Sequence, residues 1–217
     1  MTEQMKKMLD YTRERLEGYA HPISHLCAVG YSKFGHTLRV MTWAKRLYEN
    51  ASFKQEVCFD DLMIAAIFHD IGYSSAADLE YHARESARLC REYLKTEGFP
   101  EERIGKIGEM VALHSEKYRM REPDIDRGLL LLMEADLLDD MGAMSIVMDC
   151  RIEQAKNPQG GFERCADHIR AYSVRHIAGE NPLVTPYARK KWEEKKELVT
   201  TFSRSLDEDM PDQEFLI

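Results

Sequence analysis

The chain has 217 residues, of which 44% are hydrophobic and 31% charged, a composition typical of a folded globular protein and not of a disordered or fibrous one. Its formal charge of −8 argues against a nucleic-acid polymer as the main partner, because a phosphate backbone attracts positive charge. The sequence has neither an apolar signal core at its start nor a stretch long enough to span a membrane, so we expect a cytoplasmic protein without membrane contact.

Apolar residues recur at helical spacing along nearly the whole chain, and no convincing run alternates between apolar and polar residues. We therefore predict an all-α fold of about eight helices. The predicted ranges are 2–18, 36–49, 60–71, 80–97, 101–114, 126–149, 161–178 and 186–206. Asp60 and Thr185 are candidate N-caps, the second followed by Pro186 in the first turn, and Gly72 is a candidate helix end.

The length favours one domain over residues 1–217. The stretch 156–162, KNPQGGF, is the best linker candidate, but the short piece after it is a poor size for an independent core. We therefore expect the helices of 161–206 to pack on a core of approximately 30–150. The cysteines are widely spaced without a CxxC pair, so reduced core thiols are expected. They are Cys27, Cys58, Cys90, Cys150 and Cys165.

Two strong metal-ligating groups, His69 and Asp70, follow directly after the apolar helix LMIAAIF. Adjacent helical residues point about 100° apart, so they share a metal best at a helix end, where Gly72 lets the backbone turn. A His-Asp pair alone is weak support, because composition predicts about half of one by chance. The surrounding sequence must therefore supply the rest of the case.

Asp136 supplies the further support for a metal site. A carboxylate inside the apolar stretch LLLLMEADLL should be buried and therefore needs a cation or hydrogen bonds. His36 opens a helix whose apolar side should place the imidazole in the same interior. Two imidazoles and two carboxylates suit Mn²⁺, Fe²⁺, Co²⁺, Ni²⁺ or Mg²⁺ better than structural zinc. Such a metal can generate hydroxide near neutral pH and polarise a phosphoryl oxygen, so the set indicates hydrolysis.

The order of His36, His69 with Asp70, and Asp136 resembles the HD superfamily of metal-dependent phosphohydrolases, in particular its small stand-alone bacterial members. The segments HTLRV, AAIFHDIG, HARESA, ALHSEKY, EADLLDDMGA and PYARKKWEEKKELVTTF carry the same resemblance. It implies a single HD-domain bundle in which these four residues hold a divalent metal. It also implies attack by metal-bound hydroxide, with Asp70 orienting the water, on a small phosphate ester or anhydride, expected to be a nucleotide.

His82 and His114 lie between the His-Asp pair and Asp136. In two-metal relatives, histidines at such places hold a second ion that the aspartate, here Asp70, bridges. In single-metal relatives they line the phosphate pocket and donate a proton to the leaving group, as a near-neutral pKa permits. The sequence leaves both roles, and one or two ions, open. Candidate phosphate contacts are Arg39, Arg84 and Lys117.

Two rivals remain. HD-type di-iron oxygenases use the same order of ligands, which His82 and His114 would complete, and a binding module would hold metal and nucleotide without turnover. A homodimer is also left open.

Asp139 is a candidate to hydrogen bond a metal ligand from behind. The basic stretch RKKWEEKKE is expected to be an ordinary solvated helix face. The remaining histidines are expected to have structural roles, and they are His21, His25, His168 and His176.

Overall fold

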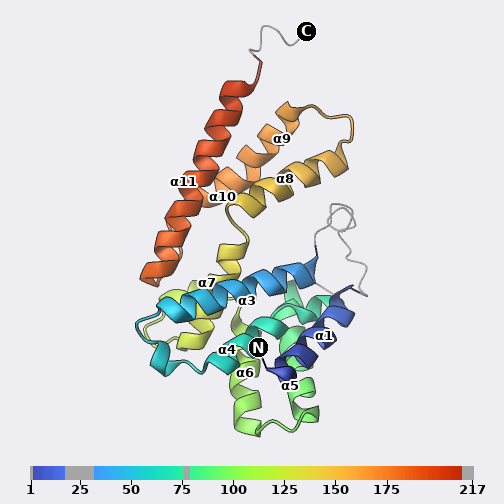
Figure 1. Cartoon of the computed structure of the whole chain (residues 1–217), viewed down its shortest axis with the longest axis vertical. Helices are drawn as coiled ribbons and strands as arrows, with labels where there is room; N and C mark the ends of the chain where they lie inside the picture. The colour runs from blue at the N-terminus through green and yellow to red at the C-terminus, as the bar shows by residue number, and fades with distance from the viewer. Residues whose placement is uncertain (1, 18–31, 76–78, 212–217) are drawn as a thin grey trace. The chain divides into compact units, whose positions relative to one another are not determined.

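The computed structural model describes residues 2–17, 32–75 and 79–211. Within these ranges the secondary structure is helical and contains no strand, which confirms the all-α prediction (Figure 1). Contacts divide the chain into two units: unit 1 comprises residues 1–22 and 32–139, and unit 2 comprises 23–31 and 140–217. Each unit is described by itself, and the packing of helices 161–206 on the core stays a prediction.

The described residues of unit 1 form six α-helices and four short 3-10 helices. The α-helices are α1 (Glu3–Glu17), α3 (Lys33–Asn50), α4 (Phe59–Phe68), α5 (His82–Thr96), α6 (Glu101–Leu113) and α7 (Arg127–Asp139). The 3-10 helices are η1 (Lys54–Glu56), η2 (Ile71–Ser74), η3 (Leu79–Tyr81) and η4 (Lys117–Arg121).

Two helices, α4 and α7, form the centre of unit 1. Residues 61–68 of α4 are all buried, and so are residues 128–135 of α7. A helix that is apolar on every side must be surrounded by other elements. Helix α4 accordingly contacts α1, α3, α5, α6 and α7, and α3 also packs along α7. The ends of these central helices therefore bring polar residues to the edge of the core.

The predicted ends of α4 were wrong. The helix begins at Phe59 with Cys58 in the N-cap position, so Asp60 lies in the first turn, where its charge favours the helix dipole without capping it. It ends at Phe68 with His69 as its C-cap, so Gly72 does not end it. Gly72 lies in η2 and does not have a positive φ. Gly72 matters because it has no Cβ, and the backbone of α5 packs closely against it.

The expectation of core thiols holds for one described cysteine and fails for another. Cys90 is buried in α5, whereas Cys58 is exposed because the turn before α4 lies at the surface. Cys150 and Cys165 are half-buried. Cys27 lies outside the described residues.

The long helix predicted over 126–149 is also wrong. The chain interrupts it after Asp139 and restarts at Ala143, with Gly142 at φ +94° as the N-cap of the second helix. A left-handed conformation suits glycine, which has no Cβ, and it stops a continuous helical hydrogen-bond pattern. The apolar periodicity continues across this point, so it could not reveal the break.

Unit 2 contains α8 (Ala143–Lys156), α9 (Phe162–Ile169), a π-helical segment (Arg170–Val174), α10 (Arg175–Ile177) and α11 (Pro186–Asp209). Thr185 caps α11 as predicted, because its hydroxyl accepts a hydrogen bond from the amide of Ala188 and Pro186 follows in the first turn. None of the described helices combines the length and the apolar character needed to cross a bilayer.

Candidate metal centre

Six side chains that the sequence singled out come together in unit 1. They are His36 of α3, His69 and Asp70 after α4, His82 at the start of α5, His114 after α6 and Asp136 of α7. Most lie at helix ends, where side chains from several helices can meet. All six lie in, or just after, α4 or a helix that packs against α4.

His36, His69 and Asp136 form the first group of candidate ligands. Nε2 of His36 lies 3.2 Å from Nε2 of His69 and 3.1 Å from Oδ1 of Asp136. Nε2 of His69 lies 3.9 Å from the same carboxylate oxygen. The two histidines are buried, whereas the side chain of Asp136 is 15% exposed. The group therefore lies at the boundary between the core and solvent.

Asp70 joins this group to a second one. Its Oδ2 atom lies 3.4 Å from Nε2 of His36 and 3.5 Å from Nε2 of His69. Its Oδ1 atom lies 3.4 Å from Nε2 of His82 and 3.5 Å from Nε2 of His114. Each oxygen of one carboxylate thus faces a different pair of imidazoles. This is the arrangement expected of a carboxylate that bridges two sites.

The imidazoles are oriented from behind. Nδ1 of His69 lies 2.8 Å from the carbonyl of Ala66, and Nδ1 of His114 lies 2.7 Å from the carbonyl of Val111. Nδ1 of His36 lies 2.8 Å from Oδ2 of Asp139, the residue that the sequence proposed for such a contact. A carbonyl or carboxylate can only accept, so each Nδ1 donates. In a neutral ring the Nε2 atom then carries the lone pair and faces the centre.

The electrostatics of the centre follow from this geometry. Burial lowers the pKa of His36, but hydrogen bonds to Asp136 and Asp139 outweigh it and raise the pKa to about 10. Burial lowers the pKa of His69 to about 4. Without a metal ion, His36 is therefore the cationic member of this histidine pair and His69 the neutral one.

The carboxylates are held ionised. Burial alone raises the pKa of Asp70, but the charge of Lys33 and the neighbouring histidines hold it well below the usual range. Burial acts in the same way on Asp136, where Lys117 and His36 keep the pKa low. An ionised carboxylate is a much better metal ligand than a carboxylic acid, so both residues are prepared for a cation.

These residues fit a divalent metal ion. The ligand atoms of His36, His69 and Asp136 lie within 4.8 Å of one another, and the same holds for Asp70, His82 and His114. Nitrogen and carboxylate oxygen in this mixture suit a divalent ion, and the choice among Mn²⁺, Fe²⁺, Co²⁺, Ni²⁺ and Mg²⁺ stays a prediction. Converging lone pairs in a buried site would repel one another without a proton or a cation between them.

Cationic side chains surround the centre, and the sequence analysis missed one of them. Lys33 Nζ lies 2.7 Å from Oδ2 of Asp70. The predicted helix began at residue 36, so Lys33 was not considered part of it. The signal that could have found it is Ser32, whose hydroxyl accepts from the amide of Gly35 and starts α3 three residues earlier. Lys33 then lies one turn before His36, on the same helix face.

The predicted phosphate contacts Lys117 and Arg39 lie next to the centre, each against a carboxylate. Lys117 Nζ lies 2.6 Å from Oδ2 of Asp136 and 3.2 Å from the carbonyl of Met133. Arg39 Nε donates to Asp139, with distances of 2.8 and 3.1 Å to its two oxygens. Both cations therefore hold acidic residues of the centre, and a role for them in phosphate binding stays a prediction.

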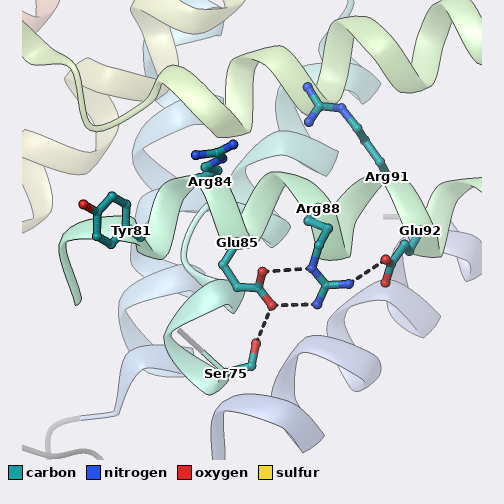
Figure 2. Close-up of a pocket in the computed structure, with 7 residues that line it drawn as sticks. All are labelled: Ser75, Tyr81, Arg84, Glu85, Arg88, Arg91 and Glu92. Carbon is teal, nitrogen blue, oxygen red and sulfur yellow. Dashed lines mark hydrogen bonds and ion pairs between the residues drawn. The ribbon is translucent and has the colours of Figure 1, made fainter. Parts of the chain in front are cut away.

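Arg84 is placed differently. It lies two residues after His82 on α5, and residues so spaced point about 160° apart around a helix. Figure 2 shows it lining a pocket along α5, with Tyr81, Arg88 and Arg91. Arg88 is paired there with Glu85 and Glu92. The structure therefore does not bring Arg84 together with the six candidate ligands, and a phosphate contact from it stays a prediction.

Gly72 allows the second group to form. A Cβ atom at this position would lie 2.2 Å from the carbonyl oxygen of His82 and 2.5 Å from the amide nitrogen of Ser86. The Gly72 amide donates to the Ser86 hydroxyl at 2.8 Å, which fastens η2 to the first turn of α5. Because only glycine permits this approach, it brings His82 close to Asp70.

The other histidines lie away from the centre. His21 and His25 are outside the described residues, and His176 is exposed. His168 has carboxylate partners that lie far from it in sequence, because folding brings α8 beside α9. Its ring nitrogens lie 3.3 Å from Glu153 and 3.8 Å from Asp149. These contacts tie two helices of unit 2 together, which agrees with the structural role expected for it.

Comparisons with known proteins agree with this description. The HD domain family matches residues 34–141, a range that contains all six candidate ligands. Among curated proteins, none matches the chain.

Several solved structures share the fold, among them the following three. A predicted HD superfamily hydrolase from an uncultured Thermotogales bacterium has 21% sequence identity and a TM-score of 0.59, covering 94% of this chain and 91% of that one. YpgQ from Bacillus subtilis, in complex with ADP, has 20% identity and a TM-score of 0.66, covering 98% and 97%. An HD-superfamily hydrolase from Bacillus thuringiensis has 16% identity and a TM-score of 0.67, covering 95% and 96%.

At these identities the likeness to solved structures establishes the fold, and the family match identifies the domain that carries the candidate ligands. With that domain in residues 34–141, the chain belongs to the HD-domain family.

Proposed function

We propose that the protein is a metal-dependent phosphohydrolase acting on a small phosphate ester or anhydride, with a nucleotide as the expected substrate. The observation that carries this proposal is the position of Asp70. One of its oxygens faces His36 and His69, and the other faces His82 and His114. A buried ionised carboxylate between two pairs of imidazoles is a metal-binding arrangement, and the side chains of Asp136 and His82 give the centre partial exposure to solvent.

His36, His69, Asp70 and Asp136 would hold the metal. When bound, a divalent ion lowers the pKa of a coordinated water and polarises a phosphoryl oxygen. Asp139 keeps Nδ1 of His36 engaged, and the carbonyl of Ala66 does the same for His69, so both rings present Nε2 to the ion. Asp70 would also orient the attacking water through its carboxylate.

His82 is the candidate proton donor. Its side chain is 14% exposed, whereas those of His36, His69 and His114 are almost fully buried. Its ring stacks on Tyr73 at a centroid distance of 4.3 Å, which fixes its plane near Asp70. An accessible imidazole so placed can protonate a leaving oxygen. With a second ion, His82 and His114 would become its ligands instead.

The nucleotide preference is supported by one neighbour of the same fold. The Bacillus subtilis protein YpgQ was solved in complex with ADP. In this chain no sequence motif recognises a base, so the chemistry of the centre supports the phosphate part of the substrate more directly than the nucleoside part. Nucleoside phosphates are therefore the first compounds to test, with simple phosphate esters beside them.

The experiment is product release from a panel of nucleotides and phosphate esters with Mn²⁺, Co²⁺, Ni²⁺ or Mg²⁺ added. Asp70→Asn removes the charge of the bridging carboxylate and is expected to abolish turnover. Asp60→Asn is its matched control, because Asp60 is an exposed residue in the first turn of α4. Turnover that requires added metal, is lost in Asp70→Asn and is retained in Asp60→Asn supports the proposal. Absence of turnover on every compound by folded, metal-loaded protein would reject it.

A second candidate function is that of a di-iron oxygenase, and the contact of His82 and His114 with Asp70 favours it, because all six ligands of such a centre are then present. This function predicts two iron ions per chain and substrate-dependent uptake of O₂. Tight nucleotide binding without product or O₂ uptake would instead identify a binding module.

A further inference from the structure

Two lysines hold the two carboxylates of the centre, but they hold different kinds of oxygen. Lys117 contacts Oδ2 of Asp136, while the other oxygen of that residue, Oδ1, faces His36 at 3.1 Å. Lys33 contacts Oδ2 of Asp70, which is itself the oxygen that faces His36 and His69. Lys117 therefore leaves the metal-facing oxygen of Asp136 accessible. Lys33, in contrast, lies on the metal-facing oxygen of Asp70.

This difference has an electrostatic consequence. A cation bound among His36, His69 and Oδ2 of Asp70 would share that oxygen with the ammonium group of Lys33. Like charges separated by a single atom repel strongly at the low effective dielectric of a buried site. The side chain of Asp70 is only 4% exposed, so water screens this repulsion little. Lys33 and a metal ion are thus competitors for one oxygen.

Lys33 has the means to move. It is the first residue of α3, and its long flexible side chain is 17% exposed. Its Nζ also lies 4.1 Å from the centroid of the Tyr73 ring. A cation over an aromatic ring is stabilised without an anionic partner, so Tyr73 can retain the ammonium group near the centre after it leaves Asp70.

We propose that Lys33 exchanges partners: it holds Oδ2 of Asp70 in the metal-free protein and binds a phosphoryl oxygen of the substrate once a metal has taken that oxygen. The inference rests on the proposed phosphohydrolase function. Arg39 and Lys117 stay on Asp139 and Asp136 in this account, because neither occupies a metal-facing oxygen. Lys33 is therefore a substrate-positioning residue that the metal itself releases.

The test measures binding and not turnover. Mn²⁺ affinity is measured by calorimetry on metal-free protein, and inorganic phosphate affinity on Mn²⁺-loaded protein. Lys33→Met keeps an unbranched, flexible side chain but removes its charge. It is expected to tighten Mn²⁺ binding about threefold or more, because the competitor is gone, and to weaken phosphate binding about tenfold. A merely structural role would weaken both.

Lys117→Met and Lys54→Met are the comparison variants. Lys117→Met is expected to weaken Mn²⁺ binding, because Asp136 loses the contact that orients it, and Lys54→Met, at an exposed position in η1, should change neither affinity. Lys33→Gln provides a second neutral variant with the same expected pattern, and Lys33→Arg should restore phosphate binding to within about threefold of the wild type.

Weaker Mn²⁺ binding in both Lys33→Met and Lys33→Gln, or unchanged phosphate affinity in them, would overturn the proposal. Because neither measurement needs a substrate to be cleaved, the result is separate from the test of the hydrolase. A protein that shows the opposite shifts in Mn²⁺ and phosphate affinity yet cleaves no compound would support the partner exchange and reject the proposed function.

Discussion

The Nε2 atoms of His36 and His69 lie 3.2 Å apart, although Nδ1 of each ring is committed to an acceptor behind it. Two lone pairs at this separation repel, so a proton or a metal ion must lie between them. In the metal-free protein the proton belongs to His36, whose pKa is raised to about 10, while that of His69 is lowered to about 4. The two rings therefore act as one proton-binding or metal-binding unit.

The first prediction concerns the stability of the metal-free protein against pH. The folded-state pKa of His36 is raised from 6.5 to about 10, so its contribution is fully present below pH 6.5 and is lost as pH rises toward 10. For His69 the folded-state pKa falls from 6.5 to about 4, so stability is lost as pH falls through that window. Stability in the presence of a chelator should be greatest near pH 6.5.

Urea unfolding at a series of pH values measures this dependence, and His36→Gln should flatten the loss of stability above pH 6.5. The same loss in the variant as in the wild type would show that another group causes it.

The second prediction concerns Asp139, which accepts from Nδ1 of His36 at 2.8 Å and also binds Arg39. Asp139→Asn removes the charge that holds the ring in its ligand orientation. Loss of such a supporting carboxylate typically weakens metal binding about 10- to 100-fold. Calorimetry with Mn²⁺ checks this, with Asp60→Asn as the control. An affinity within about twofold of the wild type would mean that Asp139 does not support the metal site.

The third prediction concerns Gly72, where a new Cβ would lie 2.2 Å and 2.5 Å from backbone atoms of α5. Because backbone cannot move aside as a side chain can, Gly72→Ala should reduce the free energy of unfolding by about 2 kcal/mol or more. It should also weaken metal binding by displacing His82 from Asp70. Gly105→Ala is the matched control, since a Cβ there meets nothing within 4 Å. In α6 that change should be neutral or stabilising by about 0.5–1 kcal/mol.

Chemical denaturation of both alanine variants gives the comparison. Equal stabilities for Gly72→Ala and Gly105→Ala would contradict the close approach of η2 to α5.

The sequence predicted much of the fold and the six candidate ligands because both have local signals. The apolar runs around His69 and Asp136 indicate buried helices, and a polar metal-ligating residue beside such a run is conspicuous. The order of ligands along the chain then resembled one family. The structure brings the six residues together, while their individual roles stay predictions.

The parts of the fold and of the site that the sequence did not predict depend on features that local patterns do not contain. Lys33 was missed because α3 starts one turn earlier than its apolar pattern suggested. The break at Gly142 was missed because apolar spacing continues across it, although a positive φ interrupts the helix. The carboxylate partners of His168 come from another helix, so spacing along the chain could not identify them. Each of these depends on backbone conformation or on packing between distant segments.

The most direct test of the central claim is to run the reaction of the nucleotide and phosphate ester panel in H₂¹⁸O with Mn²⁺ and to analyse the products by mass spectrometry. Hydrolysis by attack of water on phosphorus predicts one ¹⁸O atom per turnover on the product that contains the attacked phosphorus, whether this is phosphate, pyrophosphate or a nucleoside monophosphate, with no labelled product from the Asp70→Asn variant. The absence of ¹⁸O from every phosphorus-containing product of the wild-type protein would contradict the account.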